Sequence, residues 1–232
     1  MLIAPALSVL LAAALLAALL RWPGLLPMDR PNQRSLHAGL VPRAGGLALV
    51  PAVLVGWAFI APYPLLASAS VTVLAVASYL DDRRGLPVAL RLALHLVAAG
   101  VFASSIAANT PWLLLVATAL AVAWSINLYN FMDGSDGLAG GMALFGFGAY
   151  AIAAWLQGAS EFAAINLCVA AAALGFLIHN FPPARAFLGD AGAVPLGYLA
   201  AALGISGVAS ALWPWWFRLL VFSPFVVDAT VT

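Results

Sequence analysis

Long stretches without a formal charge, separated by short charged clusters, constrain the fold of this chain more than any other feature. Residues 2–20, 44–80 and 92–132 contain no Asp, Glu, Lys or Arg, and residues 137–184 contain one acid, Glu161. A helix of about 20 apolar residues crosses the hydrocarbon core of a bilayer. The pattern therefore predicts an all-α, polytopic integral membrane protein.

The composition excludes several other classes of protein. Hydrophobic residues make up 65% of the 232 residues, against roughly 45–50% in soluble domains, and the mean hydropathy is +1.07. These values exclude a soluble globular domain and a disordered chain. The net charge of +1 offers no basic face for nucleic acid. The one cysteine, Cys168, excludes a disulfide framework and a cysteine zinc site.

Proline-containing turns inside the uncharged stretches set the number of predicted helices. Residues 61–64 and 109–111 contain the prolines that divide the two longest stretches. We expect residues 1–232 to form one membrane-embedded domain with about nine transmembrane helices, at 2–20, 45–61, 65–80, 88–107, 112–130, 137–156, 162–179, 191–209 and 213–230.

The distribution of charge along these helices predicts their orientation. Counting crossings assigns 15 of the 17 charged residues, including eight of the nine Arg, to one face. The positive-inside rule makes that face cytoplasmic and leaves the N-terminus outside. Four tryptophans fall at predicted outer helix ends, as expected for an aromatic belt, with packing between helices as the plainer explanation: Trp112, Trp213, Trp215 and Trp216.

The segment 127–141 concentrates polar residues between two predicted helices. Asn127 and Asn130 are three residues apart and share one helix face. Asp133 and Asp136 follow at the same spacing, before a glycine-rich helix start where a ligand can approach backbone N–H groups. A turn with Asp136 as N-cap is the plainer alternative. Such a turn requires one of these side chains, whereas the segment supplies four.

Three further polar segments lie on the same predicted face. The adjacent pair Asp81 and Asp82 could hold a metal and act as a base, or form a charged turn. Asp190, between two glycines, is either a helix cap or an acid that faces a ligand. Residues 29–46 offer three Arg and His37, either to bind phosphate or to anchor the loop inside. Seven of the eight acids are Asp, and several of them converge at predicted helix ends on this face, which suits a hard cation such as Mg²⁺. The alternative, solvated loop charge, would favour Glu and Lys as well, and both are nearly absent.

Taken together and in this order, three segments resemble the polyprenyl-phosphate N-acetylhexosamine-1-phosphate transferases: 81–82, 127–139 and 187–192. The resemblance extends over roughly residues 29–228. Members of that family transfer a sugar-1-phosphate from a UDP-sugar to a lipid phosphate at the cytoplasmic face and release UMP. The resemblance implies an Mg²⁺-dependent phosphotransferase of the bacterial inner membrane. It would use a UDP-N-acetylhexosamine and undecaprenyl phosphate in a first membrane step of cell-wall or surface-polysaccharide synthesis. It is also compatible with a homodimer.

The resemblance also implies roles for individual residues. Asp81 matches the base for the lipid phosphate, and Asp82 lies beside it, near the metal. Asp190 matches a ligand of Mg²⁺, and Phe187 matches an aromatic residue that stacks on uracil. The other substrate-binding residues implied are Asn127, Asn130, Asp133, Asp136, Arg43, His37 and Arg83.

Several positions depart from the family pattern. Arg83 and Arg84 follow the acid pair where many members carry Lys nearby, and Ala193 replaces a usual Ser. The loop at 37–43 lacks the Lys and Thr residues of the muramoyl-pentapeptide enzymes, which favours the branch that uses simple N-acetylated aminosugars. The family continues beyond the position of Thr232 with a His-bearing arm and another span, so we expect a C-terminally shortened chain.

Two other classes of membrane protein remain as alternatives. A transporter or magnesium channel would carry its acids in mid-span, whereas here they fall at helix ends. A CDP-alcohol phosphotransferase also has a membrane motif that contains Asp-Gly, but Ala-Arg and two later Asp residues follow it there. In this chain Leu-Ala-Gly follows Gly137, and the next acid is Glu161. The chain contains no GxGxxG, Walker A, HExxH or GxSxG motif, so nucleotide-redox, P-loop, zincin and serine-hydrolase chemistry lack support.

Overall fold

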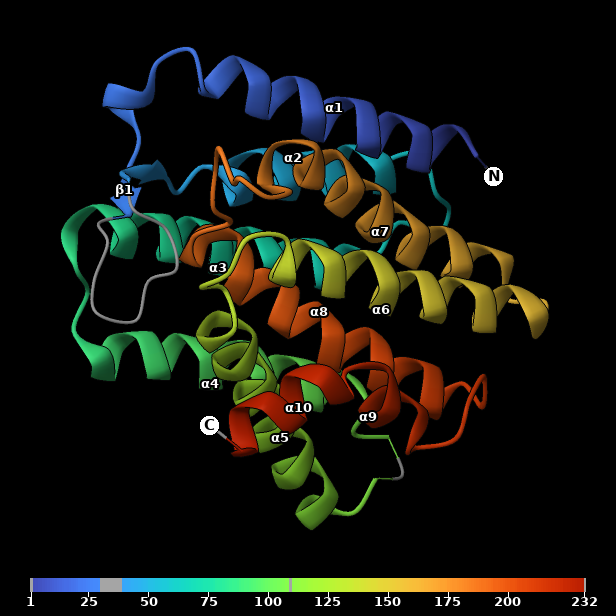
Figure 1. The fold of residues 1–232 in the computed structure, drawn as a ribbon. Coiled ribbons are helices and arrows are strands. Elements are labelled where there is room, and N and C mark those ends of the chain that lie inside the picture. The colour runs from blue at the N-terminus through green and yellow to red at the C-terminus, as the bar shows by residue number, and fades with distance from the viewer. Residues whose placement is uncertain (1, 30–38, 109, 232) are drawn as a thin grey trace.

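The computed structural model describes residues 2–29, 39–108 and 110–231, and these form a bundle of helices lying side by side (Figure 1). Two short strands and a 3₁₀ turn precede the second helix. The elements in chain order are α1 (Ile3–Leu19), η1 (Pro23–Leu25), β1 (Met28–Asp29), β2 (Val41–Pro42), α2 (Gly45–Trp57), α3 (Leu65–Arg84), α4 (Val88–Ser105), α5 (Trp112–Phe131), α6 (Leu138–Leu156), α7 (Ser160–Asn180), α8 (Asp190–Ala209), α9 (Phe217–Val221) and α10 (Ser223–Val231).

The prediction of a mostly helical, polytopic membrane protein is confirmed. Within the described residues, six helices, α3 to α8, are long and apolar enough to cross a bilayer. The helices α1 and α2 are apolar but shorter, with 17 and 13 residues. The count of nine spans and the outward N-terminus remain predictions.

The predicted helix at 213–230 differs from the structure, because two short helices, α9 and α10, occupy this segment. The helix is interrupted at Phe222, directly before Ser223 and Pro224. Proline has no backbone N–H and cannot donate to the residue four positions earlier, here Leu220. It is tolerated in the first turn of a helix, so a new helix begins at Ser223.

The same region decides between the two explanations for Trp213, an aromatic belt and packing, in favour of packing. Trp213 is 6% exposed, and its ring stacks on that of Tyr150 with a centroid separation of 4.9 Å. Its Nε1–H donates to the carbonyl of Gly204 at 3.0 Å. Burial with a satisfied N–H makes Trp213 a packing residue between α6, α8 and α9. By contrast, Trp112, Trp215 and Trp216 are exposed.

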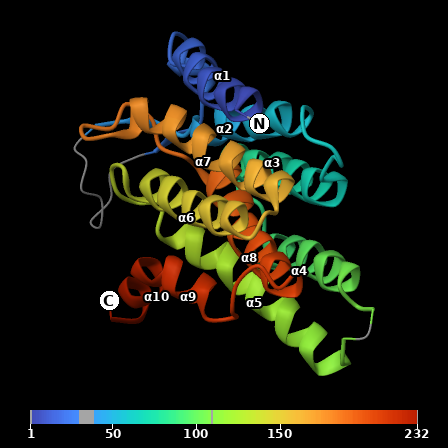
Figure 2. The same cartoon turned by 90° about the vertical axis from the view of Figure 1, so that its right-hand side faces the viewer.

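Helix α8 lies in the middle of the bundle in both views (Figures 1 and 2). In its apolar window, 89% of the residues are buried, a larger share than in any of the other candidate spans. Glycines allow α2 to approach α8 closely: a Cβ added to Gly46 would lie 2.2 Å from the backbone nitrogen of Gly192. Small residues permit such contacts between membrane helices. The beginning of α2 is therefore held against the beginning of α8.

Short backbone pairings fix the loops at this end of the bundle. Strand β1 pairs with β2 in antiparallel register, with Met28 opposite Pro42. The next residue, Arg43, forms an isolated parallel bridge with Phe187. The N–H of Phe187 donates to the carbonyl of Pro42 at 2.9 Å, and the carbonyl of Phe187 accepts from the N–H of Gly45 at 2.9 Å. These bonds join the first charged loop to the segment that leads into α8.

Candidate active site

Arg43 connects two carboxylates that come from distant parts of the chain. Its Nε donates to Oδ1 of Asp29 at 3.1 Å, and its Nη1 donates to Oδ1 of Asp82 at 3.1 Å. The side chain of Asp82 is 1% exposed. A buried carboxylate is costly unless it is paired and hydrogen-bonded. The Arg43 guanidinium therefore makes the ionised form of Asp82 tolerable in this position.

The N-terminus of α8 is held by two acids from other helices or loops. Asp82 Oδ2 accepts from the N–H of Ala191 at 3.3 Å, and Asp133 Oδ2 accepts from the N–H of Gly189 at 3.0 Å. Free backbone N–H groups at a helix N-terminus favour negative charge. Gly189 has φ +70° and ψ 168°, a conformation that glycine adopts far more readily than other residues. This turn fixes Asp190 as the first residue of α8.

Asp133 lies between α5 and α6, and its pKa differs strongly from the ordinary value of an aspartate. The pKa of Asp133 is raised to about 7, mainly by burial and also by the nearby charges of Asp190 and Asp82. The hydrogen bond from Gly189 and the charge of Arg43 oppose this rise. Three carboxylates thus share one region, and a cation bound among them would relieve their repulsion.

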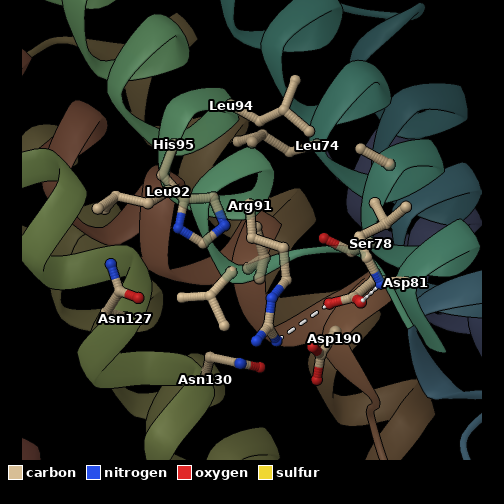
Figure 3. Close-up of a pocket in the computed structure, with 14 residues that line it drawn as sticks. Leu74, Ser78, Asp81, Arg91, Leu92, Leu94, His95, Asn127, Asn130 and Asp190 are labelled. Atoms are coloured by element: carbon tan, nitrogen blue, oxygen red, sulfur yellow. Dashed lines mark hydrogen bonds and ion pairs between the residues drawn. The ribbon is translucent and has the colours of Figure 1, made fainter.

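Asp81, also at the end of α3, has hydrogen-bond partners different from those of Asp82. Its Oδ1 accepts from the N–H of Leu86 at 2.5 Å, and its Oδ2 accepts from Nη1 of Arg91 at 3.1 Å. The Asp81 side chain is 8% exposed. Figure 3 shows the Asp81–Arg91 pair beside Asp190 and Asn130, with Arg91 reaching down from α4.

Two cavities meet at this group of residues. The first, of about 250 Å³, lies between α3, α4, α5 and α8; it is lined by Asp81, Arg91, His95, Asn127 and several aliphatic side chains (Figure 3). The second is polar and has a volume of about 130 Å³. Its lining is Asp29, Arg43, Asn130, Asp133, Gly134, Phe187, Gly189 and Asp190. Asn130 and Asp190 line both cavities, so they stand between a polar compartment and one whose walls combine charged and aliphatic side chains.

The structure therefore brings together most of the residues that the sequence singled out. Asp136 lines neither cavity and joins two loops instead, because its Oδ2 accepts from the N–H of Ala184 at 2.9 Å. Arg83 points elsewhere: it donates to the carbonyl of Leu25 at 2.6 Å and covers the ring of Tyr79. It lines neither cavity. His37 lies outside the described residues.

Several residues of this site were not assigned a role from the sequence. Asp29 pairs with Arg43, and Arg91 pairs with Asp81. Asn180 joins two loops, since its Oδ1 accepts from the N–H of Gly137 at 3.0 Å and its Nδ2 donates to the carbonyl of Ala186 at 2.9 Å. The sequence offered a clue to the role of Arg91, because this residue lies in the first turn of the helix that follows Asp81 and Asp82. Asn180 had none.

Comparison with known proteins identifies the family of the chain. Residues 64–208, more than half of the chain, match glycosyl transferase family 4. The chain is 30% identical over 198 residues to the probable undecaprenyl-phosphate N-acetylglucosaminyl 1-phosphate transferase of Bacillus subtilis, covering 78% of this chain and 55% of the relative. The chain belongs to glycosyl transferase family 4.

Shorter matches link the chain to a second group of relatives. It is 46% identical over 79 residues to the phospho-N-acetylmuramoyl-pentapeptide-transferase of Geobacillus thermodenitrificans, covering 34% of this chain and 24% of the relative. The protein of the same name from Anoxybacillus flavithermus is 48% identical over 71 residues, which cover 31% of this chain and 22% of that relative. The chain thus spans about half the length of the Bacillus relative, and these two alignments cover about a quarter of the muramoyl enzymes. The resemblance to sugar-phosphate transferases is confirmed at the level of the family.

The carboxylates of this family 4 chain fit a metal that is shared with a substrate. Among the described residues, no group of three or more His, Cys, Asp or Glu side chains is arranged as a complete metal site. Mg²⁺ does not require one, because it is commonly held by one or two carboxylates together with substrate phosphates and water. Asp82 and Asp190 are close enough to influence the same neighbour, Asp133. They could supply the protein's part of such a site.

Proposed function

We propose that this family 4 protein is a membrane-embedded transferase that moves an N-acetylhexosamine-1-phosphate from a UDP-sugar to undecaprenyl phosphate. The products are the polyprenyl-diphospho-sugar and UMP. We propose further that the reaction occurs at the cytoplasmic face of the bacterial inner membrane, with the N-terminus outside, as the positive-inside rule suggests. The names of the relatives support this substrate class, and the chain covers about half of the Bacillus subtilis relative.

The observation that carries the proposal is the meeting of two unlike cavities at Asn130 and Asp190. The reaction joins a polar, soluble donor to an apolar, membrane-bound acceptor, so its site requires one compartment of each kind with a shared boundary. The polar cavity suits the diphosphate of the donor. The larger cavity, between helices apolar enough to cross a membrane, combines Arg91 with aliphatic side chains and suits the lipid phosphate.

The proposed chemistry is an attack of one phosphate on another. An oxygen of the lipid phosphate attacks the sugar-linked phosphorus of the donor, and the bond from that phosphorus to the oxygen of UMP breaks. Both partners are anionic, so positive charge is needed for their encounter and for the transition state. Mg²⁺, when bound, would neutralise the diphosphate and the departing UMP.

The residues of the chain would then act in stated ways. Asp82 and Asp190 would hold the metal, and Asp81 would accept the proton of the lipid phosphate. The position of Asp81 supports this role, since its side chain is buried and lines the larger cavity beside Arg91. Arg43 would keep Asp82 ionised and attract the diphosphate. Phe187 lines the polar cavity and would stack on uracil.

The direct test is UMP release by membranes that contain the protein. UDP-N-acetylglucosamine, undecaprenyl phosphate and Mg²⁺ are supplied together, and each is omitted in turn. We expect UMP only when all three are present. A panel of other UDP-N-acetylhexosamines identifies the sugar. Release that does not depend on the lipid phosphate would contradict the transfer, as would magnesium uptake by vesicles without any UMP.

The orientation has its own test. In a Cys168→Ala background, a cysteine at position 85, between α3 and α4, should react with an impermeant maleimide only from the cytoplasmic side. A cysteine at position 158, in the exposed turn between α6 and α7, should react only from outside. Labelling of both positions from one side would contradict the proposed crossing pattern.

A further inference from the structure

A second polar layer lies one helical turn deeper in the bundle than the carboxylates. Three residues from three helices form it: Ser78 on α3, His95 on α4 and Asn127 on α5. Each of these residues lies three or four positions from a residue of the carboxylate region on its own helix: Ser78 from Asp81, His95 from Arg91, and Asn127 from Asn130. The two members of each pair therefore lie on the same face of their helix. Figure 3 shows these residues around the inner part of the 250 Å³ cavity. The proposed chemistry does not use this layer.

His95 is the member of this layer with an unsatisfied group. It is 8% exposed, and its Nδ1 is buried without a hydrogen-bond partner among the described residues. The Nε of Arg91, one turn away on the same helix, is also buried without a partner. A buried polar atom without a partner costs about 1–3 kcal/mol, so two of them beside one cavity suggest a missing ligand.

The chemistry of the cavity limits what that ligand can be. Arg91 supplies positive charge and an unpaired N–H, which favours an anionic oxygen. The remaining walls include Leu74, Leu92 and Val194, which favour a hydrocarbon. The cavity lies between helices that are apolar enough to cross a membrane. A phosphate attached directly to an apolar chain satisfies all three conditions.

We propose that His95 is a positioning residue for the lipid acceptor. It forms a hydrogen bond to the phosphate end of a polyprenyl phosphate and so sets the depth at which the phosphate lies beside Asp81. This inference rests on the proposed function and adds a specific acceptor-binding residue to it. The plainer explanation is a histidine that only links helices by hydrogen bonds. That role predicts a hydrogen-bond partner for Nδ1, and none of the described residues provides one.

Binding without the donor separates these explanations. The probe is farnesyl phosphate in detergent, compared with farnesol, which lacks the anion, and with inorganic phosphate, which lacks the chain. We expect wild-type protein to bind farnesyl phosphate most tightly. His95→Leu should weaken this binding roughly tenfold to a hundredfold, as expected for a lost hydrogen bond to a charged group. His95→Gln keeps a donor and should remain within about threefold of wild type.

Kinetics and a matched control complete the test. His95→Leu should raise the KM for the lipid phosphate while leaving the KM for the UDP-sugar unchanged. Asn166 is also fully buried within the bundle, with an unpartnered Oδ1, but it lies on α7 away from the cavity. Asn166→Leu should leave both KM values unchanged. Equal effects of His95→Leu on both substrates, or an equal loss in His95→Gln, would overturn the proposal.

A measurement on the unmodified protein covers the case in which the variants do not fold. Diethyl pyrocarbonate modification of His95, followed by mass spectrometry, should be slowed by farnesyl phosphate but not by farnesol or inorganic phosphate. Equal modification in all three cases would overturn the proposal. If wild-type protein binds and is protected but releases no UMP with any UDP-sugar, the proposed function fails while the lipid-phosphate site stands.

Discussion

Replacement of Gly189 by Ala tests the geometry of the proposed site most directly. Gly189 has φ +70° and ψ 168°, a region that only glycine occupies readily. Forcing another residue into such a region costs about 1–3 kcal/mol. An added Cβ would also lie 3.0 Å from the Cβ of Arg43 and 3.1 Å from Oδ2 of Asp82. Both contacts are tighter than normal van der Waals separation.

The neighbours cannot move freely to relieve this crowding. Arg43 is tied to Asp29, and Asp82 is tied to the N–H of Ala191. The backbone at Gly189 must therefore shift by a few tenths of an ångström, and Asp190 shifts with it. Catalytic groups tolerate displacements of about 0.5 Å, and a misplacement of about 1 Å can cost roughly 100-fold in rate. We expect UMP release to fall about 10- to 100-fold and unfolding to become easier by about 1–3 kcal/mol.

Two glycine controls separate strain from crowding. Gly158 has φ +78° but nothing within 4 Å of an added Cβ, so Gly158→Ala should destabilise the protein and spare turnover. Gly100 lies within α4 with open space around it, so Gly100→Ala should change neither quantity adversely. UMP release and thermal unfolding in detergent are measured for all three variants. Wild-type turnover in Gly189→Ala, or an equal loss in Gly158→Ala, would refute the reasoning.

Three other substitutions test single roles. Asp190→Asn should abolish Mg²⁺-dependent UMP release in a folded, inserted protein, because the amide lacks the anionic oxygen that a hard cation requires; turnover within threefold of wild type at millimolar Mg²⁺ would contradict the assignment. Phe187→Ala should weaken UDP binding by about 1–3 kcal/mol, the scale of base stacking, as measured by calorimetry; unchanged affinity would make Phe187 a packing residue only. Arg43→Lys should lower both turnover and the unfolding temperature, because one ammonium group cannot reproduce the forked contacts to Asp29 and Asp82; wild-type values for both would show that these contacts are dispensable.

Features that are determined by residues close together in the sequence could be predicted from local patterns. The spacing of Asn127 and Asn130 predicted a shared helix face, and both line the same cavity. The glycines around Asp190 predicted a helix N-terminus, and α8 begins at Asp190. These features depend on helical period and on glycine conformation, which act over a few residues.

Contacts between distant segments could not be predicted in the same way. Nothing local indicates that Arg43 pairs with Asp82, because Arg43 precedes α2 and Asp82 lies near the end of α3, and the two meet only where both pack against the beginning of α8. Likewise, a tryptophan near a helix end is typical of an aromatic belt, yet Trp213 is buried against Tyr150. Its position is set by tertiary packing, which hydropathy does not encode.

The beginning of α8 explains why residues so far apart in the sequence form one site. Backbone N–H groups at Gly189 and Ala191 bind the carboxylates of Asp133 and Asp82. Gly192 meets Gly46, which brings the start of α2 and its preceding loop to the same point. One helix start thus orients acids from two other segments and also holds the loop that carries Arg43, so all three depend on the backbone geometry at this point. Substitutions in residues 187–192 should therefore affect catalysis more than equally conservative substitutions on the exposed faces of α4 or α5.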